Sequence, residues 1–175
     1  MLVDRVLDFL QERRNNILEG NINCIPLPFS RFRKELPGIE QGVYYLVSGA
    51  TKSAKTQITN YLFVYNTLFY AFNHKEKVHP KIFYYNLEET PESITLRFMA
   101  YLLYRFSNKE IRISPTDLKS TDETKVLSQE TLDLLKSPRY KEMLNFYEEC
   151  VEYRTSRNPT GKKDLEVKKI YYIFV

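Results

Sequence analysis

The sequence predicts an α/β fold in which a parallel β-sheet is flanked by helices, is incomplete at its C-terminal end, and is preceded by an N-terminal helix. Three observations predict it: short apolar runs bounded by glycine or polar residues, helical patterns that alternate with them, and a loop motif rich in small residues between the first run and the next helix. Strands that are apolar on both faces and alternate with helices are typical of parallel sheets.

The elements follow from periodicity and from start and stop residues. Apolar residues recur at helical spacing over residues 2–19, and Gly20 supplies a stop, so this segment is expected to be a helix. Two prolines in the following NINCIPLPF break regular structure. The remaining expected elements are a buried strand over 43–48, a helix over 55–74, a second strand over 81–89, a helix from Pro91, short helices and loops over 108–137, a helix over 137–154 whose end can turn extended, and a last strand over 168–175.

Composition bounds the class of protein. A length of 175 residues suits one domain with at most an appendage, and 43% hydrophobic residues allow a sizeable core. The net charge of +4 permits a nucleic-acid partner without requiring one. Cys24 and Cys150 lack metal-type spacing, no apolar run reaches ~18 residues, and the N-terminus is charged. We therefore expect a cytoplasmic protein without a disulfide framework, zinc site or membrane span.

The most informative motif is SGATKSAKT at residues 48–56. The phosphate-loop pattern is G-x-x-x-x-G-K-[ST]; Gly49, Lys55 and Thr56 stand at matching positions, and Ala54 replaces the second glycine. Lys55 is predicted to contact phosphates, and Thr56 to offer its hydroxyl to Mg²⁺. The candidate nucleotide-binding residues are Gly49, Ala50, Thr51, Lys52, Ser53, Ala54, Lys55, Thr56 and Gln57.

The motif also has a purely structural interpretation, and one of its residues departs from the phosphate-loop pattern. A strand–turn–helix corner with a surface lysine has the same local pattern. In addition, Ala54 weakens the match, because an L-residue held in left-handed geometry costs about 1–2 kcal/mol. That cost equals about one decade of affinity if the strain arises only on binding.

A pair of carboxylates follows the second expected strand. Glu88 and Glu89 stand just before the helix that begins at Pro91. Ligands of open parallel sheets bind beyond the carboxyl ends of the strands, so a carboxylate here is expected to polarise a water that attacks a phosphate. The alternative is that both are helix-start acids favoured by the helix dipole.

Residues 36–57 and 81–98 resemble the RecA-like ATPase core of bacterial and phage DnaB-type replicative helicases, which are related to the KaiC and RadA groups. The resemblance implies a RecA-like P-loop NTPase fold, ATP and Mg²⁺ as ligands, Glu88 as the catalytic glutamate with Glu89 as its neighbour, and a supporting helix arginine at Arg97. It also implies a ring-shaped homo-oligomer, single-stranded DNA as a partner, and the cytoplasm of a bacterial cell or a phage origin. The expected domains are 1–28, a helix with a proline-containing linker, and 29–175, a partial nucleotide-binding domain.

Three functions follow from these residues. The leading hypothesis is the ATP-hydrolysing motor of a DnaB-type helicase. The alternative is a P-loop-fold adaptor or assembly module without hydrolysis, such as a helicase loader; Ala54 and the lack of a strand that ends in a magnesium-binding aspartate favour it. A third option is another P-loop enzyme such as a small kinase, which needs a substrate lid that the sequence does not reveal.

Overall fold

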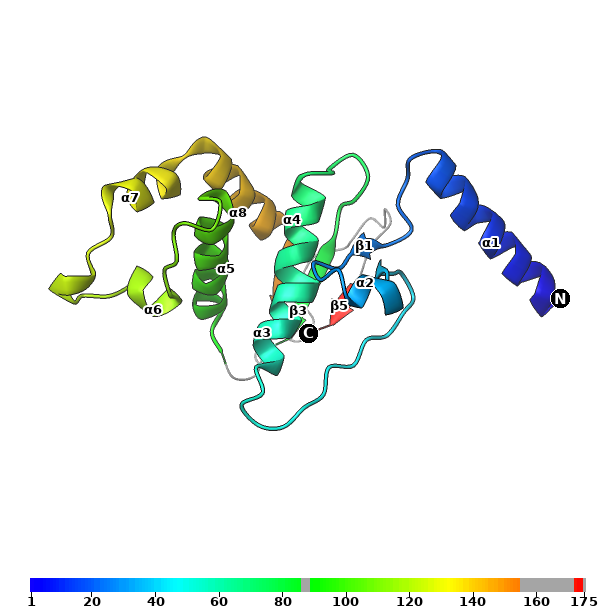
Figure 1. Ribbon diagram of the computed structural model, residues 1–175, viewed down its shortest axis with the longest axis horizontal. Coiled ribbons are helices and arrows are strands. Elements are labelled where there is room, and N and C mark those ends of the chain that lie inside the picture. Colours follow the sequence, from blue (N-terminus) through cyan, green and yellow to red (C-terminus); the bar gives the residue numbers. More distant parts are fainter. Residues whose placement is uncertain (86–88, 155–171, 175) are drawn as a thin grey trace. The chain divides into compact units, whose positions relative to one another are not determined.

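The computed structural model describes residues 1–85, 89–154 and 172–174. Its contacts divide the chain into two units, Met1–Pro80 and Lys81–Val175, and Figure 1 labels their helices and several of their strands. The division predicted between residues 28 and 29 falls inside the first unit.

The first unit begins with the predicted N-terminal helix. Helix α1 spans Leu2–Leu18, and Gly20 follows it with a φ of 72°, in the left-handed region that favours glycine. Near its C-terminal end, the Arg13 guanidinium pairs with the Glu40 carboxylate at 2.7 Å. The hydrogen bond to Glu40 raises the pKa of Arg13. This ion pair connects α1 to the residue that follows strand β2.

A short antiparallel pair follows α1. Strands β1 (Ile25–Pro26) and β2 (Gly38–Ile39) pair with Ile25 opposite Ile39, and the short helix α2 (Phe32–Glu35) lies between them in the chain. Ile25 and Ile39 are both buried. A Cβ atom at Gly38 would lie 2.4 Å from the Ile25 carbonyl oxygen, so the backbones approach closely enough to require glycine there.

The strand predicted over 43–48 does not form. This segment has no regular structure, pairs with no strand in the described part of the chain, and exposes Tyr44 and Leu46 by 84% and 77%. Tyr45 anchors it: the Tyr45 hydroxyl accepts from the Glu40 N–H and donates to the Gly38 carbonyl, both at 3.0 Å. An apolar run becomes a buried strand only where neighbouring strands supply hydrogen bonds, and here a side chain bonds to the hairpin instead.

The helix predicted after the loop is confirmed, with an irregular centre. Helix α3 (Lys55–Thr59), the π-helical segment η1 (Asn60–Tyr65) and helix α4 (Asn66–Phe72) follow one another without a break. Residues 62–65 are all buried. Since successive helical residues turn by about 100°, four buried neighbours mean that the middle of this helix is covered on nearly every side.

The second unit is built on a small parallel sheet. Strand β3 (Lys81–Tyr85) lies between β4 (Val151–Arg154) and β5 (Tyr172–Phe174), in the order β4-β3-β5. Both pairings are parallel, with Ile82 opposite Val151 on one side and Ile173 on the other. The strands expected within 81–89 and 168–175 are therefore confirmed over 81–85 and 172–174, and residues 86–88 lie outside the described ranges.

Helices supply most of the core of the second unit. Helices α5 (Pro91–Phe106) and α8 (Pro138–Cys150) pack together: the rings of Phe98 and Tyr147 stack at 4.4 Å, and the Tyr140 hydroxyl donates to the Met99 carbonyl at 2.9 Å. Between them come α6 (Pro115–Leu118), the short 3-10 helix η2 (Glu123–Lys125) and α7 (Gln129–Lys136). The fully buried side chains of this core include Ile82, Ile94, Phe98, Leu102, Leu103, Tyr140 and Met143.

The predicted RecA-like P-loop NTPase fold is wrong for this structure. Its core was expected to be one parallel sheet containing residues 43–48 and 81–89. In the described residues, helices predominate, and the strands are short and divided between a two-stranded and a three-stranded sheet. The physical reason is that β3 has β4 and β5 as its neighbours, so the 43–48 run does not join its sheet.

Candidate phosphate-binding loop

The loop over residues 49–54 is exposed along its whole length and ends where α3 begins. Ala54 adopts φ 59° and ψ 26°, which is left-handed geometry, and it is the residue that caps α3. Lys52 is also left-handed, with a φ of 63°. Within the loop, the Ser53 N–H donates to the Ala50 carbonyl at 3.3 Å. Ala54 therefore stands where the motif has its second glycine, and it has the left-handed backbone conformation for which glycine is suited.

Lys55 folds back over the loop that precedes it. Its ammonium group donates to the carbonyl oxygens of Gly49 at 2.8 Å and Ala50 at 2.7 Å. These contacts close the loop into a ring with the cation at its edge. An ammonium group has three donors, so two bonds to the loop leave one N–H for a ligand.

Gly49 is held close to the far side of the loop. A Cβ atom there would lie 2.8 Å from the Ser53 hydroxyl oxygen, which is closer than ordinary contacts, so Ser53 would have to move to admit any other residue. Because the Ser53 hydroxyl is the end of a rotatable side chain, this contact alone does not require glycine at position 49.

The start of α3 completes the site. Thr56 and Gln57 are exposed in its first turn, where backbone N–H groups have no acceptor inside the helix. The positive end of the helix dipole points at the same place. Leu62, Val64 and Leu68 are buried further along the same continuous helix, so the loop is fixed to a packed element.

The predicted carboxylates lie in the second unit, whereas the loop lies in the first. Glu88 is outside the described residues. Glu89 is half-buried and pairs with Arg97, its carboxylate oxygen 3.0 Å from the guanidinium nitrogen. Helix α5 starts just after it, where the Thr90 hydroxyl accepts from the Ser93 N–H. The structure thus brings together two of the residues that the resemblance singled out, Glu89 and Arg97.

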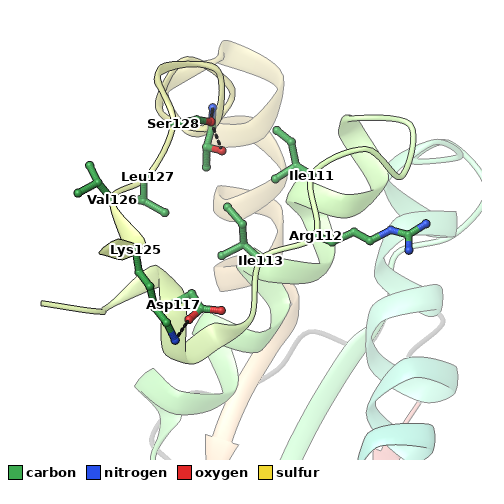
Figure 2. A pocket seen from close by; sticks show the side chains of 9 residues that line it. Ile111, Arg112, Ile113, Asp117, Lys125, Val126, Leu127 and Ser128 are labelled. Atoms are coloured by element: carbon green, nitrogen blue, oxygen red, sulfur yellow. Dashed lines mark hydrogen bonds and ion pairs between the residues drawn. The ribbon is translucent and has the colours of Figure 1, made fainter. Parts of the chain in front are cut away.

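A pocket that the sequence did not indicate lies in the second unit (Figure 2). It has a volume of about 430 Å³ and apolar walls that include Ile111, Ile113 and Leu127. At one end, the Lys125 ammonium pairs with the Asp117 carboxylate at 2.8 Å. This ion pair lowers the pKa of Asp117, and a hydrogen bond from Ser114 adds to the effect. Short apolar segments inside a polar stretch were its only sequence signal.

Other candidate groups have structural roles. The His74 ring stacks on Tyr70 at 4.2 Å and bonds to its carbonyl oxygen. Burial raises the pKa of the Cys150 thiol to about 12 and also raises that of Cys24. No group of three or more His, Cys, Asp or Glu side chains in the described ranges is placed to hold a metal ion. No helix among those residues combines the length and apolarity needed to cross a membrane.

Comparison with known proteins adds no relative: no family model, curated protein or solved structure matches the chain.

Proposed function

We propose that residues 49–57 bind the phosphate groups of a nucleoside triphosphate, with ATP and Mg²⁺ as the ligands. The observation that carries the proposal is the contact of the Lys55 ammonium with the carbonyls of Gly49 and Ala50, at the edge of an exposed loop that runs directly into a helix. Successive backbone N–H groups, a helix start and a fixed cation are the parts of a phosphate cradle.

Each residue has a distinct role in this proposal. The backbone of 50–55 and the first turn of α3 supply N–H donors to phosphate oxygens, and Lys55 supplies a positive charge. The Thr56 hydroxyl is exposed beside them and fits the position of a magnesium ligand in the motif. Thr56 would hold Mg²⁺, which would supply positive charge that offsets the negative charge of the phosphates.

ATP hydrolysis is the finer part of the proposal. On the sequence resemblance alone, Glu88 is proposed to orient the attacking water, with Glu89 next in line; in the structure Glu89 pairs with Arg97. The wider assignment to a DnaB-type helicase motor, with ring formation and single-stranded DNA as a partner, is supported by the sequence resemblance alone. Phosphate binding by the loop does not use the RecA-like sheet, which the structure contradicts, whereas the role of Glu88 in hydrolysis rests on the resemblance alone.

A second function is favoured by one specific contact. Because the Glu89 carboxylate is engaged by Arg97, it is less available to replace Glu88 as the base, which favours a module that binds nucleotide without hydrolysing it if Glu88 does not act. Such a module would act as an adaptor or assembly factor. Binding without turnover is the result that selects this alternative.

The first experiment is a titration of a fluorescent ATP analogue, with and without Mg²⁺, against wild type and the Lys55→Ala variant. Loss of a charge-assisted contact is expected to weaken binding by about 10–100-fold. The matched control is Lys34→Ala, which removes the same charge from an exposed position on α2. Equal binding by wild type and Lys55→Ala, or no binding by either, would refute the nucleotide proposal.

Phosphate release then separates the two functions. If wild type hydrolyses ATP, Glu88→Gln is expected to abolish turnover and to leave the affinity unchanged. Retained turnover in Glu88→Gln, with loss in Glu89→Gln, reassigns the base. Tight binding without release in wild type supports the adaptor alternative.

A further inference from the structure

The pocket of the second unit has an apolar wall made by two segments without regular structure. Ile111 and Ile113 come from the segment that follows α5, and Leu127 comes from the segment between η2 and α7. Figure 2 shows these three side chains directed into the space between the segments, whereas the Arg112 side chain points away from it. All three are half-buried. A concave apolar wall of this kind, beside a few polar groups, is the usual lining of a small-molecule site.

One end of the pocket presents two opposite charges. The Lys125 ammonium lies 2.8 Å from the Asp117 carboxylate, and the two side chains are exposed by 51% and 34%. The ammonium keeps two N–H donors beyond this contact. The carboxylate, which also accepts from the Ser114 hydroxyl, keeps acceptor capacity on both oxygens. Because Arg112 points away, the charges directed at this end of the pocket cancel.

The ion pair restricts the charge of a ligand. An anion that approaches Lys125 is repelled by Asp117, and a cation that approaches Asp117 is repelled by Lys125. A ligand with an ammonium and a carboxylate side by side meets an opposite charge at each group and leaves the ion pair intact. In a free α-amino acid these two groups share one carbon, which places their nitrogen and oxygen atoms about 3 Å apart. This spacing matches the 2.8 Å between the charged atoms of Lys125 and Asp117.

We propose that this pocket binds a free α-amino acid with an apolar side chain of about the size of leucine. The carboxylate of the ligand contacts Lys125, and its ammonium contacts Asp117. Its side chain lies against Ile111, Ile113 and Leu127, in a volume of about 430 Å³ that has room for it. The proposal goes beyond nucleotide binding and does not depend on it, because the pocket belongs to the second unit and the phosphate-binding loop to the first.

The exposure of the ion pair limits the affinity. Charge contacts that remain in water contribute little, so burial of the apolar side chain supplies most of the binding free energy. After the cost of association, a dissociation constant on the order of 1–10 mM is expected.

NMR titration of the full chain with four small molecules tests the class of ligand. L-Leucine is expected to shift the signals of Lys125 and the methyl signals of Ile111, Ile113 and Leu127, with saturation. Glycine has both charges but no side chain, and is expected to bind at least about 10-fold more weakly. 4-Methylpentanoate lacks the ammonium, and 3-methylbutylamine lacks the carboxylate. Each is expected to bind about 3–10-fold more weakly than leucine, because one charge of the ion pair then repels it.

A variant of the ion pair tests the role of the charges separately from the fold. Lys125→Met keeps the length of the side chain and removes its charge, so it is expected to weaken leucine binding about 3–10-fold and to strengthen the binding of 3-methylbutylamine. A merely structural role of Lys125 would not reverse this preference. The matched control is Lys119→Met, which removes the same charge from an exposed position that does not line the pocket.

Three results would overturn the proposal. The first is the absence of saturable shifts at these residues with leucine at up to about 50 mM, well above the expected dissociation constant. The second is binding of 4-methylpentanoate or 3-methylbutylamine to wild type as tightly as leucine. The third is a Lys125→Met variant that keeps the ligand preference of wild type.

Discussion

The left-handed conformation of Ala54 predicts that replacing it with glycine stabilises the protein. In most positions Ala→Gly is destabilising, because glycine has more conformational freedom to lose on folding. Ala54 differs because its φ is 59° and its ψ is 26°, a region where a Cβ atom is disfavoured. Ala50 offers a matched control in the same exposed loop, since it is not among the residues with positive φ.

The two variants are expected to change stability in opposite directions. Ala54→Gly relieves about 1–2 kcal/mol of strain and loses about 0.4–1 kcal/mol through the freer unfolded chain, for a net gain of about 0.5–1 kcal/mol. Ala50→Gly is expected only to lose about 0.4–1 kcal/mol of stability, because no strain is relieved at that position. Nucleotide affinity is expected to change little in Ala54→Gly, because Ala54 is already left-handed with the loop closed on Lys55 alone.

Urea unfolding, followed by far-ultraviolet circular dichroism and tyrosine fluorescence, measures the difference. With an ordinary slope, the midpoint of Ala54→Gly is expected to rise by ~0.3–0.5 M and that of Ala50→Gly to fall by a similar amount. The slope should stay the same in both, since neither variant changes the surface exposed on unfolding. A midpoint for Ala54→Gly as low as that of Ala50→Gly would show that Ala54 is not strained.

Two further predictions concern titratable groups in the second unit. The hydrogen bonds from Lys125 and Ser114 favour the charged form of Asp117, so their stabilising effect is present above the ordinary pKa of about 4 and is lost as pH falls through the lowered pKa. Replacing the cation in Lys125→Met is expected to raise the pKa of Asp117, which a carboxyl NMR titration measures. An unchanged pKa would show that the ion pair does not form in solution. Burial raises the pKa of the Cys150 thiol to about 12. In the Cys24→Ser variant, the Cys150 thiol is therefore expected to react with a disulfide reagent at pH 8 only after denaturant is added. Rapid reaction of the native variant would contradict the burial of Cys150.

Local signals in the sequence predicted the helices well. The start of α5 follows from Thr90 and Pro91, and the start of α7 follows from Ser128, whose hydroxyl accepts from the Thr131 N–H. These are contacts between residues three apart, so the sequence alone specifies them. The 43–48 run was misjudged because a strand needs partners that are distant in the sequence, and Tyr45 bonds to the hairpin instead.

The same distinction applies to the candidate sites. The motif indicated the left-handed strain at Ala54, which stands where the pattern has its second glycine, but it did not indicate that the Lys55 ammonium bonds to carbonyls five and six positions earlier. The pocket in the second unit depends on Ile111 and Leu127, which are brought together only by the folding of the segment between them. No short-range pattern could have predicted that cavity.

Helix α1 shows where periodicity stops being informative. Its spacing correctly predicted a helix with one apolar face, and that pattern is usually interpreted as the face that packs on the core of the same chain. In the structure the face is exposed. Periodicity identifies which side of a helix avoids water, but it does not identify what covers that side.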